Sequence, residues 1–109
     1  MLTPEENDLL TRVGKDTAMG KLMRQHWTPV CLLEEINQPG GAPVLVEVLG
    51  DRFVAFRSPD GTVGMLDEKC PHRLASLVYA RNEDCGLRCL YHGWAFDTEG
   101  NTVSMPSEP

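Results

Sequence analysis

The sequence predicts an all-β domain with a helical N-terminal arm and an insertion at about residues 68–94. From Trp27 onward, short apolar segments alternate with clusters of turn residues, which is typical of antiparallel strands. Helix-start signals and helical apolar spacing are confined to residues 1–26. The length of 109 residues suits a single core. We therefore expect an arm over 1–26 and a β domain over 27–109.

The arm is predicted to contain two short helices. Thr3 and Glu6 have the spacing of a capping box, which predicts a helix over residues 4–13 that Gly14 ends. The segment Ala18–Gln25 carries methionine and leucine at helical spacing and predicts the second helix.

Six segments of the β domain have the composition of strands, and turn residues separate them. The expected turns include Gly50-Asp51 and Ser58-Pro59-Asp60-Gly61, with a further hairpin turn over residues 97–101. The expected strands are Val30–Leu33, Val44–Leu49, Phe53–Phe56, Val63–Leu66, Trp94–Phe96 and Thr102–Met105.

The insertion carries two short metal-ligand motifs. Cys70 and His72 form a Cys-x-His pair, and Cys89 and His92 form a Cys-x-x-His pair, with residues 73–88 between them. In a Rieske centre, two histidines replace two cysteines on one iron of a [2Fe–2S] cluster. This ligand set predicts one Rieske cluster per chain, held by Cys70, His72, Cys89 and His92.

Two other interpretations compete. A structural Cys2His2 zinc site usually pairs like ligands, whereas each half here offers one of each type. In the second alternative, the four residues bind no metal and are ordinary buried cysteines and surface histidines. Near the motif, Arg73 either faces the cluster or is a solvated surface side chain, and Gly93 allows close backbone approach. Each histidine would keep one ring nitrogen for solvent or a redox partner.

Charge and composition limit the classes of partner that the protein can have. The net charge is −6, which argues against nucleic acid, and no 18-residue apolar run predicts a membrane span. The N-terminus lacks the features of a signal peptide, so we expect a cytoplasmic protein. Cys31 and Cys85 are then expected to be free thiols rather than a disulfide. Residues 69–94 carry four basic and two acidic side chains, a net +2 that favours an acidic electron-transfer partner.

Several segments resemble the N-terminal Rieske domain of Rieske non-haem iron aromatic-ring-hydroxylating oxygenases, in the phthalate dioxygenase branch. The resemblance rests on Cys70-Pro71-His72-Arg73 and on Leu87 to Trp94. It extends to residues 2–7 and 19–24 of the arm and to residues 27–30 directly after it. It implies a Rieske-type antiparallel β-sandwich. It also implies that electrons arrive from a reductase or ferredoxin and pass to a mononuclear iron that activates O2 for mono- or dioxygenation in aromatic catabolism.

The resemblance also implies roles for the second motif. His92 would be the electron exit, close to the catalytic domain of its own or a neighbouring subunit. Tyr91 and Trp94 would form the docking surface there, or would simply cover the cluster. High-potential Rieske proteins carry Ser and Tyr where this chain has Trp94 and Phe96, so the resemblance implies a potential near the low end of the Rieske range.

The sequence lacks residues for the oxygen-activating iron. A non-haem Fe(II) site takes two histidines and one carboxylate, and only His26 remains once the cluster has its two histidines. We therefore expect the electron-transfer part of a larger oxidoreductase, with the Fe(II) in a catalytic domain outside these residues and a homo-oligomer, trimer or hexamer, at full length. The alternative is a stand-alone Rieske ferredoxin, although the helical arm favours a subunit. The sequence does not identify the aromatic substrate.

Overall fold

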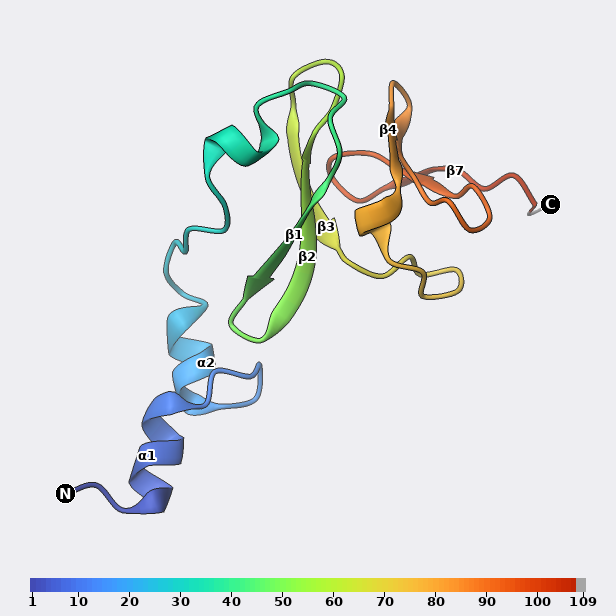
Figure 1. The fold of residues 1–109 in the computed structure, drawn as a ribbon. Helices are drawn as coiled ribbons and strands as arrows, with labels where there is room; N and C mark the ends of the chain where they lie inside the picture. The colour runs from blue at the N-terminus through green and yellow to red at the C-terminus, as the bar shows by residue number, and fades with distance from the viewer. Residues whose placement is uncertain (108–109) are drawn as a thin grey trace. The chain divides into compact units, whose positions relative to one another are not determined.

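A computed structural model describes residues 1–107 (Figure 1). Glu108 and Pro109, the last residues of the expected 27–109 domain, lie outside the described residues. The chain divides into two compact units. One contains Met1–Val30 and Glu47–Asp51, and the other contains Cys31–Val46 and the residues from Arg52 onward.

The first unit contains two short helices. Helix α1 spans Pro4–Thr11 and helix α2 spans Ala18–Met23. The capping box at Thr3 is confirmed, because its hydroxyl accepts from the Glu6 N–H at 3.1 Å and the Glu6 carboxylate accepts from the Thr3 N–H at 2.7 Å. Both helices end earlier than the sequence predicts. The backbone leaves α1 at Arg12, before Gly14, and α2 ends at Met23 rather than at Gln25. Within the described residues, no helix has the length and apolar character needed to span a bilayer.

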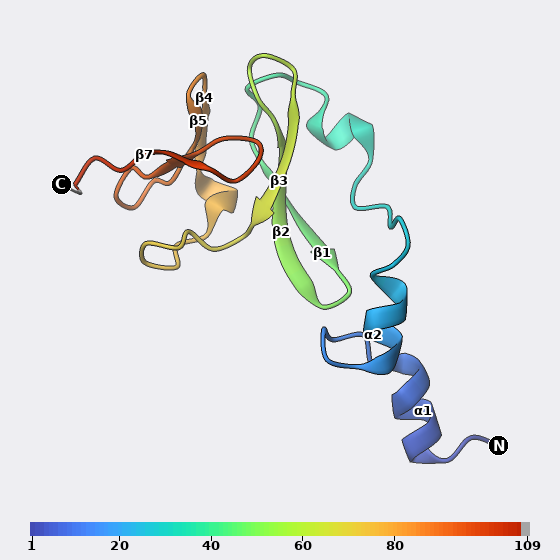
Figure 2. The ribbon, with the colours of Figure 1, turned by 180° about the vertical axis from the view of Figure 1, so that it is seen from behind.

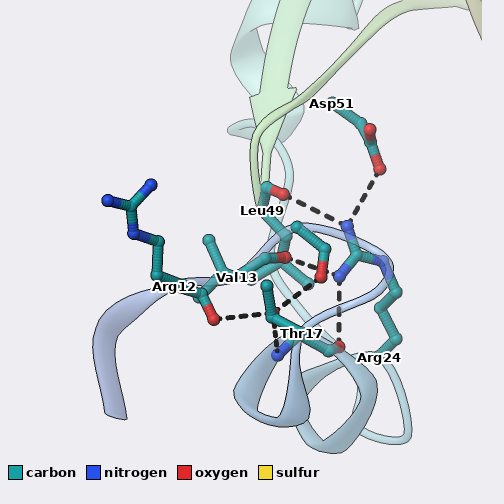
Figure 3. Close-up of polar contacts among 8 residues, drawn as sticks. Arg12, Val13, Thr17, Arg24, Leu49 and Asp51 are labelled. Atoms are coloured by element: carbon teal, nitrogen blue, oxygen red, sulfur yellow. Dashed lines mark hydrogen bonds and ion pairs between the residues drawn. The ribbon is translucent and has the colours of Figure 1, made fainter. Parts of the chain in front are cut away.

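Arg24 links the end of α2 to a β-turn in the same unit (Figure 3). Its Nη1 donates to the carbonyl of Val13 at 2.7 Å, and its Nη2 donates to the carbonyl of Leu49 at 3.1 Å and to Asp51 Oδ2 at 3.1 Å. The turn itself is formed by Leu49 and Gly50, both with positive φ, rather than by Gly50 and Asp51.

The first sheet has three antiparallel strands in the order β1-β2-β3. They are β1 (Val44–Val48), β2 (Asp51–Arg57) and β3 (Val63–Asp67), close to the predicted segments. In the β2–β3 register, Val54 pairs with Leu66 and both are buried. The predicted turn after β2 is confirmed, with the Gly61 N–H donating to the Ser58 carbonyl at 2.8 Å.

The prediction of a strand at Val30–Leu33 is wrong. A 3-10 helix, Leu33–Ile36, begins there instead, because the Glu35 carboxylate accepts from the Leu32 N–H at 2.7 Å and favours a helical start. Leu32 and Leu33 stay exposed. The apolar run therefore has no buried face, and composition alone misled the strand assignment.

The second sheet has four antiparallel strands in the order β4-β5-β6-β7, and strands β4, β5 and β7 are labelled in Figure 2. Strands β6 (Ala95–Phe96) and β7 (Thr102–Ser104) agree with the predicted hairpin. The sequence did not predict the structure inside the insertion. That structure comprises the 3-10 helix Leu77–Tyr79 and strands β4 (Arg81–Glu83) and β5 (Gly86–Arg88).

Both sheets share one apolar core. Val54 and Phe56 of β2 pack in one cluster with Leu87 of β5 and Phe96 of β6. Cys70 and Cys89 belong to the same cluster, so the core positions both motif cysteines. Two antiparallel sheets around one core confirm the predicted Rieske-type antiparallel β-sandwich.

Candidate metal centre

The two ligand motifs lie on two loops with the same backbone pattern. In the first loop, which follows β3, the Cys70 N–H donates to the Ala75 carbonyl and the Leu74 N–H donates back to the Cys70 carbonyl, both at 2.8 Å. In the second loop, between β5 and β6, the Cys89 N–H donates to the Trp94 carbonyl at 2.8 Å and the Gly93 N–H to the Cys89 carbonyl at 3.1 Å. Each loop therefore closes around its cysteine in the same way.

Both motif cysteines point into the core as free thiols. Cys70 is 1% exposed and Cys89 is 3% exposed. Burial raises the pKa of the Cys70 thiol and the neighbouring Cys89 adds to this, while N–H groups of His72 and Arg73 donate to the sulfur and oppose it. A bound metal ion would offset the burial cost by replacing the thiol proton. The other two cysteines, Cys31 and Cys85, are also free.

The two motif histidines lie against each other, nearer the surface than the cysteines. The ring centroids of His72 and His92 are 4.8 Å apart with an interplanar angle of 74°. His72 is half-buried and His92 is exposed. The loops thus bring the two buried thiols close to each other and the two imidazoles close to each other. These are the four donors that the sequence predicted.

The aromatic residues of the second loop take different places. Tyr91 contacts His92, with ring centroids 3.9 Å apart, and 63% of its surface is exposed. Trp94 instead stacks on His72 of the first loop, with centroids 4.5 Å apart and planes only 8° from parallel. Of the remaining predicted residues, Arg73 is exposed, and Gly93 has a φ of +81°.

A charged network that the sequence analysis did not single out supports the second loop. Arg88 directly precedes Cys89, and its Nη1 donates to the Gly93 carbonyl at 2.6 Å. Its Nε donates to Glu83 Oε2 at 2.8 Å. The Arg88 hydrogen bond is the main cause that lowers the pKa of the Glu83 carboxyl. Because Arg81 also pairs with Glu83, part of the positive charge of the insertion is neutralised locally.

A second network supports the first loop. Glu68, two residues before Cys70, is largely buried, and it accepts from Arg52 Nε at 2.8 Å and from the Ser76 hydroxyl at 2.7 Å. The Arg52 hydrogen bond, followed by that of Ser76, lowers the pKa of the Glu68 carboxyl. A charged residue one or two positions before each motif cysteine was the signal in the sequence. The partners of Arg88 lie five residues away on either side, whereas Arg52, the partner of Glu68, is 16 residues away.

The side chains present fit a Rieske cluster. Soft thiolates and imidazoles suit iron–sulfur ligation, and the cluster takes two protein ligands per iron. Within residues 1–107 no three His, Cys, Asp or Glu side chains gather around a single-ion site, and a cluster ligated in pairs needs no such group. The indole Nε1 of Trp94, stacked on His72, is buried without a hydrogen-bond partner in the described part of the chain. This leaves a donor available to a bound group.

Comparisons with known proteins support the predicted cofactor. Residues 26–109 match the family described as the Rieske [2Fe-2S] domain. The oxygenase subunit of phthalate 4,5-dioxygenase from Pseudomonas putida is 62% identical over 109 residues, which are all of this chain and 25% of that protein. The oxygenase subunit of 3-chlorobenzoate-3,4-dioxygenase from Comamonas testosteroni is 50% identical over 107 residues, covering 98% of this chain and 24% of that one.

Solved structures of similar fold include a monooxygenase. A dicamba monooxygenase structure with non-haem iron and dicamba has a TM-score of 0.69 at 34% identity, covering 76% of this chain and 24% of that chain. A structure of a mutant of Pseudomonas putida CBB5 NdmA with caffeine has a TM-score of 0.71 at 28% identity, covering 82% of this chain and 28% of that chain. The chain therefore spans about a quarter of the length of the curated relatives that it matches.

Proposed function

The chain belongs to the Rieske [2Fe–2S] domain family, and from that premise we propose that it passes single electrons to the mononuclear iron of an aromatic-ring oxygenase. The proposed ligands are Cys70 and Cys89 on one iron and His72 and His92 on the other. The cluster supplies the one-electron chemistry when bound. The observation that carries the proposal is the pairing of two buried thiols with two imidazoles on matching loops.

Two features of the described residues support a direction for the proposed transfer. The buried cysteines place their side of the site in the apolar core, away from water. His92 is exposed and contacts the exposed Tyr91, so electrons would leave through His92, with Tyr91 on the docking surface of a catalytic domain. Replacing Tyr91 with Ala should slow transfer to the catalytic iron in the full-length protein and leave the cluster potential unchanged.

The wider assembly is part of the same proposal. A reductase or ferredoxin would deliver the electrons, and the Fe(II) would lie in a catalytic domain of the same or a neighbouring subunit. We place the full-length protein in the cytoplasm as a homo-oligomer, a trimer or hexamer, that acts on an aromatic substrate. Support comes from the named relatives, which are oxygenase subunits about four times the length of this chain.

The test uses the 109-residue chain alone with its cluster reconstituted. It should accept electrons from a reductase, followed by bleaching of the visible absorbance, and it should form no oxidised aromatic product. Oxygen-dependent product formation by this chain alone would contradict the proposal, because His26 cannot complete a two-histidine, one-carboxylate site.

A stand-alone Rieske ferredoxin remains the second candidate, since it would share the loops and the cluster. The arm disfavours it, because the similarity to phthalate 4,5-dioxygenase extends over all 109 residues and so includes the helices. Sequencing the gene beyond residue 109 distinguishes the two. An oxygenase subunit requires two histidines and a carboxylate in the downstream sequence.

A further inference from the structure

We propose that Trp94 is a positioning residue for His72: its indole holds the imidazole from the opposite loop by stacking, and its N–H donates to a sulfur acceptor of the bound cluster. The proposal rests on the ligand set proposed above. It goes beyond that set, because it assigns to Trp94 a role in setting the reduction potential and in fixing one ligand.

The stacking crosses between the two loops. Trp94 belongs to the second loop, and its carbonyl accepts the Cys89 N–H at 2.8 Å. Its ring nonetheless lies flat on His72 of the first loop, 4.5 Å away and 8° from parallel. A single side chain therefore connects the backbone around one candidate ligand with the ring of another.

The second contact of His72 limits its ring further. His92 approaches it edge-on, at 4.8 Å and 74°. Rotation of the imidazole about its side-chain bond would drive an edge into the face of the indole, so the flat stack restricts the ring to a narrow range of orientations. An imidazole held in this way keeps its orientation in both oxidation states, and fixed ligands lower the rearrangement that accompanies each electron transfer.

The indole N–H provides the second half of the proposal. Nε1 of Trp94 is buried and has no hydrogen-bond partner among residues 1–107. Indole nitrogen only donates, and buried donors without an acceptor are rare because they lose their hydration without replacement. Trp94 packs against the apolar cluster that contains Cys70 and Cys89, so the surroundings that the protein offers are mostly apolar.

A sulfur of the bound cluster is the acceptor that this position favours. The indole already contacts one candidate ligand and packs on the core that contains two others. Because the cluster gains negative charge on reduction, a donor to its sulfur stabilises the reduced form more than the oxidised form. The N–H would therefore raise the reduction potential. If Trp94 only covered the site, an apolar side chain without an N–H would be sufficient there.

The experiment compares Trp94→Phe with Trp94→Leu in the cluster-loaded chain. Phenylalanine keeps an aromatic face for His72 and removes the N–H, whereas leucine removes both. Trp27→Phe and Trp27→Leu are matched controls, because Trp27 is the second tryptophan of the chain and is fully exposed. Two quantities are measured: the midpoint potential, and the histidine nitrogen couplings of the reduced cluster by pulsed EPR.

Both Trp94 variants should favour the oxidised form by about tenfold, which is a fall of about 59 mV for a one-electron couple. The histidine couplings should stay sharp in Trp94→Phe and should broaden or change in Trp94→Leu. Loss of the cluster from Trp94→Leu alone would also support the positioning role, since the two variants differ only in the aromatic face. The Trp27 controls should change neither quantity.

An unchanged potential in Trp94→Phe would overturn the donor role. Sharp and unchanged couplings in Trp94→Leu would overturn the positioning role. Loss of the cluster from both Trp94 variants would overturn the proposal in favour of a purely structural role for Trp94. Failure of the ligand set is recognised separately, because the unmodified chain would then show no couplings from two histidine nitrogens.

Discussion

Leu74 and Gly93 occupy equivalent positions in the two ligand loops. Each is the fourth residue after its loop cysteine and donates its N–H to that cysteine's carbonyl, at 2.8 Å for Leu74 and 3.1 Å for Gly93. Both have left-handed backbone, with φ of +61° for Leu74 and +81° for Gly93. One backbone shape therefore serves both loops, but only the second loop has the residue that adopts it without strain.

Replacing Leu74 with Gly should stabilise the cluster-loaded chain by about 0.5–1 kcal/mol, because the relief of left-handed strain exceeds the entropy cost of glycine. The Leu74 side chain is 65% exposed, so little packing is lost. The urea midpoint, followed by the visible absorbance of the cluster, measures the change. The matched variant Gly93→Ala should lower the midpoint, since the added Cβ would have ordinary contact distances and only the positive φ opposes it. A lower midpoint for Leu74→Gly would contradict the argument.

The cysteine variants test the ligand set. Cys70→Ser and Cys89→Ser should lose the cluster and loosen the loops, because metal binding contributes to their folding. Cys31→Ser and Cys85→Ser are controls that lie outside the motifs and should keep about two irons and two acid-labile sulfides per chain. Iron, sulfide and zinc analysis of all four variants provides the measurement. One zinc and no sulfide in the unmodified chain would refute the Rieske assignment.

The midpoint potential should lie toward the low end of the Rieske range, at roughly −150 mV rather than +300 mV. High-potential centres have hydroxyl donors at both positions, whereas here the indole N–H of Trp94 is at most one donor. Phe96 carries none and is buried in the core with 4% of its surface exposed. A redox titration followed by circular dichroism gives the value. A midpoint above about +100 mV would show that other groups dominate.

Arg88 should matter more to the second loop than Arg81, although both pair with Glu83. Arg88 also donates to the Gly93 carbonyl, and its side chain is 20% exposed, against 68% for Arg81. Arg88→Ala should therefore shorten the lifetime of the cluster on heating, and Arg88→Lys should rescue it only in part because lysine lacks the forked geometry. Arg81→Ala is the control with little expected effect. Equal lifetimes in Arg88→Ala and Arg81→Ala would argue against a supporting role.

Asp97 should give the β6–β7 turn a pH dependence. Hydrogen bonds from the Asn101 side chain and then from backbone N–H groups lower the pKa of the Asp97 carboxyl. The folded-state pKa lies below the unfolded value of about 3.9, so the stabilisation is complete above that value and is lost as the pH falls through the folded pKa. Unfolding measured from neutral pH into acid should show a shallower loss for Asp97→Asn than for the unmodified chain. Identical pH profiles would exclude Asp97 as a contributor.

The sequence by itself determined what depends on neighbours along the chain. The capping box at Thr3, the turn at Ser58–Gly61 and the strands β1 to β3 follow from local propensity and apolar patterning. The donor set of the candidate centre was also proposed from the sequence, because motif spacing limits which residues two short loops can bring together; it stays a prediction. The cap, the turn and each ligand motif taken by itself involve residues a few positions apart, and their energies are set locally.

Only the tertiary structure decided what depends on distant partners. It placed Trp94 on His72 rather than beside His92, and it left Val30–Leu33 without a strand partner. It also imposed the left-handed backbone on Leu74, which local preference disfavours. The physical reason is the same in each case. The core buries both motif cysteines and brings the two loops together, so the packing free energy of residues far apart in the chain outweighs local propensity.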